Sequence, residues 1–464
     1  MNKKIFSYAV LASSLLLILG AAACSRGGSG GSGGKVTLDQ TTPITLEYVR
    51  LFDDSTALDE IIASYQEKHP NIKIVVRKVN LPAGETIYDY QQDIIKQIAD
   101  GAGPDIFMIH NDWLPYQVNQ ISPMPSGLMT LEDYQARFPQ VVVDDFVTNN
   151  QIYAVPYYID NLMLYYNIDM FTAAKVKKAP RTWQELVEIV PKLTKKDANG
   201  NIIQSALPFG VADGIPRFAE ILANLIMQYG GEMTSSDRTK ATFDLPVPNS
   251  NPPVYPGSEA LKFYTSFADP QSPLYTYTDA KNPDGTRKLP EDVQAFMEHK
   301  AAMFIGYSYQ VEYIKKFMTT RLNFETAPLP QLRLENPIVV ANYWGETVSK
   351  TSKHPNEAWD FIKYVVTKSS NLNKLFSATH HVPATKESVD TYKGRQYYGP
   401  VAEQLQLCAS WYRQNSSDIE KIFTEMVNNV LHNRMAAEVA VSAAIRDIND
   451  LSSYRARTSP VPQR

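Results

Sequence analysis

The sequence predicts an α/β protein with a parallel β-sheet in its first part and a chain long enough for two domains. Between residues 44 and 110, five segments alternate between strand-like and helix-like patterns. Alternation of this kind produces right-handed crossovers and a parallel sheet. The chain has 464 residues, of which 44% are hydrophobic, so it can bury more than one core.

Each of the five segments carries its own signal. Apolar and polar residues alternate in the strand at 44–48, and "IKIVVRKV" and "PDIFMIH" predict strands at 72–79 and 104–110. The helix at 58–65 has its apolar residues on one face, and isoleucines mark a second helix at 94–98. The mostly apolar third strand is typical of a buried parallel strand.

Later parts of the chain show further elements. Thr182 and Glu185 form a capping box in front of an apolar stripe that includes Trp183, which we expect in the core. Trp359 lies on the apolar stripe of another predicted helix, and we expect it in the core as well. Residues 249–287 are rich in proline, glycine and polar residues, which predicts an irregular surface segment.

Composition and motifs argue against several classes of function. Lys and Arg number 45 against 49 Asp and Glu, with no strong basic block, so nucleic acid is not an expected partner. Matches to GxSxG and GxGxxG occur only within Gly27–Gly33, a Gly/Ser run that is not placed between a strand and a helix. His380 and His381 are adjacent and lack an evident third ligand. We therefore expect no metal, no cofactor and no catalytic residue.

The first 36 residues predict a leader and a tether. Lys3 and Lys4 precede an apolar run that ends in small residues before Cys24, an order typical of secretory signals. The segment resembles a lipoprotein signal, which implies a signal peptide at 1–23 and a lipidated cysteine with a flexible Gly/Ser tether at 24–36. A membrane-spanning anchor is the alternative, since the apolar run is just long enough. Both interpretations place the rest of the chain outside the cytoplasm, facing the periplasm or the exterior.

Seven segments between Thr42 and Ser388 together resemble the extracellular solute-binding proteins of ABC importers, the maltose-binding-protein-like group. In order, they read PDIFMIHNDW, YAVPYYIDNLMLYYNIDMF, PRTWQELVEIV, MQYGGEM, AAMFIGYSYQ, NYWGETVSKTSKHPNEAWDFIKYV and HVPATKES. The resemblance implies a periplasmic-binding-protein-like fold of type II, with two lobes that are each a sheet flanked by helices and a ligand cleft between them. It implies that lobe 1 is formed by residues 37–160 plus 342–368, and lobe 2 by residues 161–341 plus 369–464.

The same resemblance implies which residues contact the ligand. Asp53 and Asp54 follow the first strand, and Asn111, Asp112 and Trp113 follow the third, at the sheet edge where parallel sheets bind ligands. The remaining expected ligand-binding residues are Tyr158, Asp160, Arg217, Tyr309, Tyr343 and Trp344.

Some of these residues have a purely structural alternative. Asp54 can serve only as a helix cap, Trp113 can lie on the surface, and Trp344 can be a core residue at the crossing strands. Tyr309 stands where the family frequently has a tryptophan, which implies a smaller stacking ring.

Two functions of different classes fit these observations. The first is a binding protein that captures a small solute, a sugar or oligosaccharide, and delivers it to an ABC permease. Flat aromatic rings suit the apolar faces of a pyranose, and carboxylates and amides suit its hydroxyl groups. The second is an exported glycoside-acting lipoprotein enzyme, which would need two carboxyl groups held about 5–5.5 Å apart if it is of the retaining kind. Binding of oligosaccharides without turnover would distinguish the first from the second.

Overall fold

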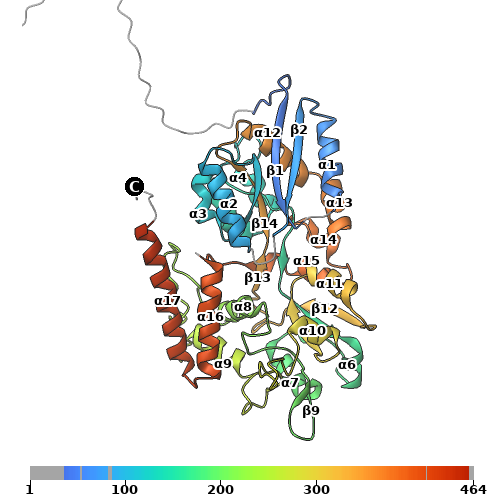
Figure 1. The fold of residues 1–464 in the computed structure, drawn as a ribbon, viewed down its shortest axis with the longest axis vertical. Helices are drawn as coiled ribbons and strands as arrows, with labels where there is room; N and C mark the ends of the chain where they lie inside the picture. Colours follow the sequence, from blue (N-terminus) through green and yellow to red (C-terminus); the bar gives the residue numbers. More distant parts are fainter. Residues whose placement is uncertain (1–35, 53–54, 82–85, 414, 459–464) are drawn as a thin grey trace, which may run out of the picture. The chain divides into compact units, whose positions relative to one another are not determined.

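The first β-sheet confirms the predicted alternation of strands and helices. The computed structural model describes residues 36–52, 55–81, 86–413 and 415–458. Five strands lie in the order β2-β1-β3-β14-β4 (Figure 1). They are β2 (Ile72–Val79), β1 (Ile44–Leu51), β3 (Ile106–His110), β14 (Trp344–Ser349) and β4 (Ile121–Ser122). β1 is parallel to β2 and β3, whereas β14 is antiparallel to β3 and β4.

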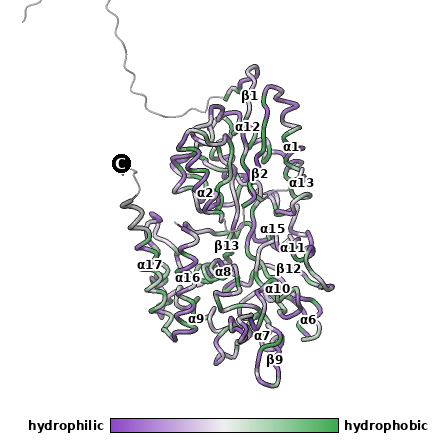
Figure 2. Tube along the Cα trace, viewed as in Figure 1, coloured by the Kyte–Doolittle hydropathy of each residue, from purple (hydrophilic) through white to green (hydrophobic). Residues whose placement is uncertain are grey.

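The helices of this part cover the sheet with their apolar sides. Helix α1 (Ala57–Gln66) buries Leu58, Ile61 and Tyr65, and hydrophobic and hydrophilic residues alternate along it in Figure 2. Helix α12 (Pro355–Val366) contributes Trp359, which is fully buried and donates a hydrogen bond from Nε1 to the Ser122 carbonyl at 3.0 Å. The expectation that Trp359 is a core residue is therefore confirmed.

A second sheet of three antiparallel strands lies in the order β11-β8-β12. Its strands are β11 (Met303–Gly306), β8 (Met163–Asn167) and β12 (Phe324–Pro328). Helix α7 (Trp183–Leu193) begins after Thr182, whose side chain accepts a hydrogen bond from the Glu185 amide at 3.1 Å. Trp183 is buried and its Nε1 donates to Gln228 at 2.7 Å, so its predicted place in the core is confirmed.

One expectation about local structure is wrong. The stretch 249–287 contains helix α9 (Pro256–Thr265), in which Leu261 and Tyr264 are fully buried. Pro256 occupies the first turn, where a missing N–H costs nothing, so the proline that suggested an irregular segment in fact begins a helix.

Three short strands connect the regions of the two larger sheets. They are β7 (Asp160–Asn161), β13 (Val339–Asn342) and β15 (Cys408–Ala409), in the order β15-β13-β7. Asn161 is fully buried and donates from Nδ2 to the Val401 carbonyl at 3.0 Å, while Gln404 donates to the Asn161 side-chain oxygen at 2.8 Å. These bonds attach strand β7 to the segment that contains Val401 and Gln404. The lobe boundaries at residues 160, 342 and 368 stay predictions.

The other elements complete the two regions. The helices are α2 (Ile87–Ala99), α3 (Leu114–Gln117), α4 (Leu131–Arg137), α5 (Gln140–Phe146), α6 (Ile168–Ala173), α8 (Phe218–Gln228), α10 (Asp292–Met297), α11 (Tyr309–Phe317), α13 (Ser369–Thr379), α14 (Ser388–Tyr392), α15 (Gly399–Glu403), α16 (Ser416–Leu431) and α17 (Ala437–Thr458), with 3-10 helices at Val118–Gln120 and Leu405–Leu407. The remaining strands form two small hairpins, β5 (Val147–Thr148) with β6 (Gln151–Ile152), and β9 (Lys195–Lys196) with β10 (Ile202–Gln204). Among the described helices, none has both the length and the apolar character that a membrane span requires.

Candidate functional site

A cavity of about 410 Å³ lies beside the crossing strands. Its volume falls within the range of roughly 300–1,000 Å³ that is usual for small-molecule sites. Aromatic residues dominate its lining, with a few polar groups among them. The lining residues are Phe52, Ile87, His110, Tyr158, Asp160, Arg217, Tyr307, Tyr309, Asn342, Trp344 and His381.

Trp344 is the centre of the aromatic wall that the first sheet contributes. The register of β14 on β3 places Trp344 opposite His110, and their rings are 5.2 Å apart and nearly perpendicular. Trp113 packs against Trp344 from behind, with ring centroids 5.0 Å apart. Trp344 is only 6% exposed, so it is both a cavity residue and a well-packed one.

Phe52 contributes an exposed ring to the same wall. Its side chain is 56% exposed and lies edge-on to Trp344 at 5.7 Å. Its backbone has a φ of 62°, a left-handed conformation that is unfavourable for a bulky residue. Strained conformations of this kind concentrate at functional sites, which supports a role for Phe52 at the cavity.

Asp160 connects the crossing strand β7 to the start of helix α11. Its Oδ2 accepts hydrogen bonds from the Ser308 amide at 2.9 Å and from the Ser308 hydroxyl at 2.8 Å, and its Oδ1 accepts from the Asn161 amide at 2.9 Å. Burial raises the pKa of Asp160 to about 6, against the opposing effect of these hydrogen bonds. Because Ser308 immediately precedes Tyr309, the carboxylate fixes the position of this cavity ring.

Strand β11 ends at Gly306, where Gln310 packs closely over the backbone. A Cβ on Gly306 would lie only 1.8 Å from Oε1 of Gln310. That oxygen accepts a hydrogen bond from the Tyr307 amide at 2.9 Å. The rings of Tyr307 and Tyr309 lie 6.4 Å apart and almost parallel, so the segment after β11 presents two aromatic groups at the cavity.

Arg217 supplies the cationic group of the lining. It precedes helix α8, and its Nη1 lies 3.1 Å from a carboxylate oxygen of Glu220. Its guanidinium carbon is 5.9 Å from the centre of the Tyr307 ring. The charge of Glu220 raises the pKa of Arg217, which therefore stays protonated. Within the described part of the chain, Arg217 Nε and the Tyr307 hydroxyl are buried and have no hydrogen-bond partner.

Five of the predicted ligand-binding residues line this cavity: Tyr158, Asp160, Arg217, Tyr309 and Trp344. Trp113 supports Trp344 from behind and does not line it. Tyr343 is fully buried and donates its hydroxyl hydrogen to Asp145 at 2.5 Å. Asp53 and Asp54 lie outside the described residues.

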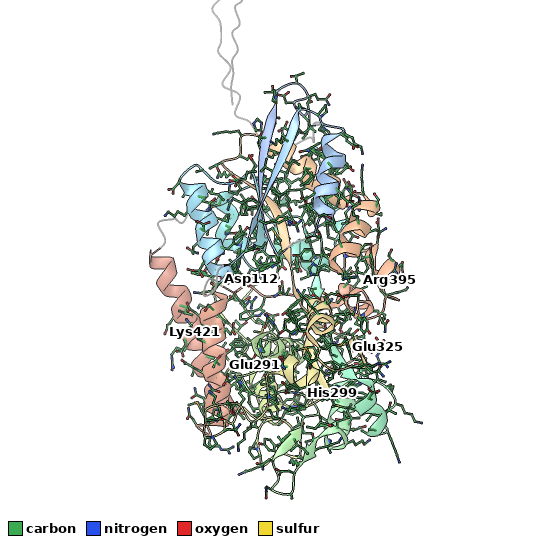
Figure 3. The ribbon with its side chains drawn as sticks, turned by 45° about the vertical axis from the view of Figure 1, so that its right-hand side comes forward. Asp112, Glu291, His299, Glu325, Arg395 and Lys421 are labelled. Carbon is green, nitrogen blue, oxygen red and sulfur yellow. The ribbon has the colours of Figure 1, made fainter. Side chains whose placement is uncertain are left out.

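Asn111 and Asp112 line a second cavity, of about 350 Å³. Asp112 is almost fully buried and contacts His110 Nδ1 at 2.5 Å and Arg413 Nε at 2.9 Å; Figure 3 labels it near the start of α16. Burial raises the pKa of Asp112, but the neighbouring His110 and Arg413 lower it to about 2. Asn111 donates to Asp145 at 3.1 Å. These contacts tie the end of β3 to neighbouring segments.

The family model described as bacterial extracellular solute-binding protein matches residues 60–397. The chain belongs to this family. Because the match covers well over half of the chain and the family is extracellular, the protein is an exported solute-binding protein. The family is one of binding proteins, and its matched region contains nearly all of the described cavity lining.

Individual relatives and solved structures agree with this assignment. The maltodextrin-binding protein MdxE of Bacillus subtilis is 24% identical over 388 residues, which is 81% of this chain and 80% of the relative. The sugar-binding protein MalE of Xanthomonas citri has a TM-score of 0.70 at 16% identity, covering 89% of this chain and 98% of that one. A cyclo/maltodextrin-binding protein complexed with maltotetraose has a TM-score of 0.68 at 17% identity, covering 88% and 97%. These likenesses confirm the two-lobe α/β fold class.

Several lining residues of this solute-binding protein were absent from the sequence-based prediction. They are Phe52, Ile87, His110, Tyr307, Asn342 and His381. Tyr307 and Asn342 lie within one or two residues of positions that the family resemblance singled out. A prediction that included the sequence neighbours of those positions would have found them. His381 lies beside Tyr158, with ring centroids 4.6 Å apart, although the two are far apart in sequence.

Proposed function

We propose that this solute-binding protein captures a sugar or oligosaccharide in the 410 Å³ cavity and delivers it to an ABC import permease. The observation that carries the proposal is the pairing of aromatic walls, with Phe52 and Trp344 from the first sheet region and Tyr307 and Tyr309 from the second. Aromatic faces stack on the apolar C–H faces of a pyranose. The relatives named above, which are sugar- and maltodextrin-binding proteins by name, support the same ligand class.

Polar groups at the cavity suit the hydroxyl groups of a sugar. His110, Arg217 and Asn342 line the cavity, and their side chains carry donors and acceptors of the kinds that pair with hydroxyl groups. His110 Nε2 and the Asn342 side-chain oxygen lie 3.2 Å apart at the same cavity. A neutral, hydroxyl-rich ligand fits these groups, because a hydroxyl can accept a hydrogen bond from a donor and also donate one to an acceptor.

The alternative of a glycoside-acting enzyme receives less support. Retaining glycosidases need a pair of carboxyl groups at the reacting bond. Among the described residues that line the cavity, Asp160 is the single carboxylate, and both of its oxygens already accept hydrogen bonds from Ser308 or Asn161. We therefore propose binding without turnover.

Calorimetric titration of the purified full chain with oligosaccharides tests this function. Maltose, maltohexaose, mannobiose and mannohexaose provide two linkage types and two lengths. We expect saturable binding to at least one series, a raised melting temperature and no change in the sugar after prolonged incubation. Release of shorter sugars would favour the enzyme, and absence of binding to every sugar would contradict the proposal.

We further propose that the protein is anchored to the cell membrane by a lipid on Cys24, with residues 24–36 as a tether. These residues lie outside the described part of the chain, and the proposal depends on the lipoprotein-like leader in the sequence. A tethered binding protein stays near its permease while remaining free to reorient. Stable anchoring by acyl chains generally needs more than one chain.

A further inference from the structure

A stripe of exposed aromatic side chains runs along helix α11 and begins at the cavity. Tyr309 lines the cavity, and Tyr313 and Phe317 follow at intervals of four residues. Residues spaced by four lie on the same face of a helix. The three residues are 45%, 46% and 51% exposed.

The stripe has a regular spacing. A rise of about 1.5 Å per residue places Tyr313 roughly 6 Å and Phe317 roughly 12 Å along the helix axis from Tyr309. The rings of Tyr313 and Phe317 lie 4.8 Å apart, and those of Tyr309 and Tyr307 lie 6.4 Å apart. Two pairs of aromatic rings, Tyr307 with Tyr309 and Tyr313 with Phe317, therefore lie between the cavity and the end of the helix.

The stripe is not needed to hold α11 in place. The opposite face of the helix buries Val311 and Ile314 in the core of the second region. Glu312 accepts a hydrogen bond from the Tyr398 hydroxyl at 2.5 Å and fixes the helix from the side. Single exposed hydrophobic residues are common, but a row that continues from a binding cavity marks an interaction surface.

We propose that the ligand is a linear oligosaccharide longer than the cavity, whose outer sugar units lie along Tyr313 and Phe317. This inference rests on the proposed sugar-binding function and specifies its substrate class. A chain of pyranose units repeats an apolar face at regular intervals, which suits aromatic residues that recur every four positions on one helix face. The first of these residues, Tyr309, lines the cavity. The cavity holds one end of the chain, and α11 guides the remainder outward.

The test compares short and long sugars on variants that change only the stripe. The double variant Tyr313→Ala/Phe317→Ala removes both outer rings, Tyr313→Phe retains a ring, and Tyr255→Ala removes an equally exposed tyrosine that lines none of the described cavities. Calorimetry with maltose and maltohexaose, and with mannobiose and mannohexaose, measures affinity. Because all three substituted side chains are about half exposed, the variants should melt close to the wild type.

We expect the wild type to bind the hexasaccharide more tightly than the disaccharide of the series it accepts. The double variant should lose at least about fivefold in hexasaccharide affinity and change less than twofold for the disaccharide, as expected for two lost aromatic contacts. Tyr313→Phe and Tyr255→Ala should match the wild type. Unchanged hexasaccharide affinity in the double variant, with normal disaccharide binding, would overturn this inference alone. If the double variant keeps its hexasaccharide affinity but loses transport through the intact importer, the stripe contacts another protein, and this outcome also overturns the inference. A wild type that binds neither series would overturn the proposed function itself.

Discussion

Replacing Asp160 separates a direct role in ligand binding from a positioning role. The carboxylate accepts hydrogen bonds from the Ser308 amide, the Ser308 hydroxyl and the Asn161 amide, all at 2.8–2.9 Å, and it lines the cavity. In Asp160→Asn, the remaining oxygen can accept from both amides and the new NH₂ group can donate to the serine hydroxyl. In Asp160→Ala, both buried amides lose their acceptor.

These differences set the expected magnitudes. An unsatisfied buried donor costs about 1–3 kcal/mol, so Asp160→Ala should lower the free energy of unfolding by about 2–6 kcal/mol. Asp160→Asn should cost about 1 kcal/mol or less at neutral pH, and its sugar affinity should remain within about twofold if the carboxylate only positions Tyr309. If instead the charged oxygen binds a sugar hydroxyl directly, Asp160→Asn should lose about tenfold or more in affinity, since such a bond is worth about 1.5–3 kcal/mol.

Urea unfolding and calorimetric titration of the same preparations measure both quantities. Ser308→Ala is a matched control, because it removes the hydroxyl but leaves the backbone amide that Asp160 accepts. A tenfold loss of affinity in Asp160→Asn with unchanged stability would refute the positioning role. Equal stability of the alanine and wild-type proteins would refute the hydrogen-bond argument itself.

The pH dependence provides an independent check. Burial raises the pKa of Asp160 from 3.8 to about 6, so the folded protein binds this proton more tightly than the unfolded chain. The stabilisation is therefore complete below about pH 4 and is lost as the pH rises through 6, by about 3 kcal/mol in total. Asp145, whose pKa burial also raises to about 6, contributes a similar slope. The difference between wild type and Asp160→Asn isolates the contribution of Asp160, and a difference that does not change with pH would contradict it.

Three further changes test the cavity and the anchor. Tyr309→Ala should lower sugar affinity by about tenfold while the melting temperature stays close to the wild type, and normal affinity in this variant would contradict its place at the ligand. Trp344 is 6% exposed and packs among four rings, so Trp344→Ala should lower both the sugar affinity and the free energy of unfolding, the latter by about 3–5 kcal/mol. Gly306→Ala should displace Gln310 and weaken sugar binding, which calorimetry would measure. Ala302→Gly, a change of one methyl group in the adjoining segment, serves as the comparison. Cys24→Ser should release the protein from the membrane fraction or leave it uncleaved, as measured by fractionation and mass spectrometry; unchanged processing and retention would exclude the lipid anchor.

The local elements could be predicted because each buries one side of a periodic pattern. Leu58, Ile61 and Tyr65 recur at helical intervals and all face the core, and the isoleucines of β2 and β3 lie where the apolar runs predicted strands. The insertion of β14 between β3 and β4 could not be derived in this way, because no local pattern records which distant strand completes a sheet. The family resemblance implied only that residues 342–368 belong to lobe 1, and it did not give the place of this strand in the sheet.

The end of β3 shows how one residue changes a site prediction. The sequence-based prediction named Asn111 and Asp112, but the first cavity is lined by His110, while Asn111 and Asp112 line the second. Strand β3 ends at His110 and the chain turns at residues 111–112, so the side chains before and after this point face different cavities. An alignment to a family cannot resolve a shift of one position where identity is near 20%, whereas the pairing of Trp344 with His110 determines it directly.

Asp160 illustrates the same limit for chemistry. A carboxylate at the first crossing strand was predicted to reach the ligand, and the structure places it at the cavity but with its oxygens already bonded to Ser308 and Asn161. Sequence patterns report which groups are present in a segment, but whether a carboxylate has spare hydrogen-bonding capacity depends on backbone amides contributed by distant segments. In this protein one of the two amides belongs to Ser308, directly before α11, the helix that carries Tyr309, Tyr313 and Phe317. One buried carboxylate therefore connects the crossing strands to the start of the helix that carries the aromatic stripe. Asp160→Ala should alter the binding of short and long sugars together, whereas changes at Tyr313 or Phe317 should alter only the binding of the long ones.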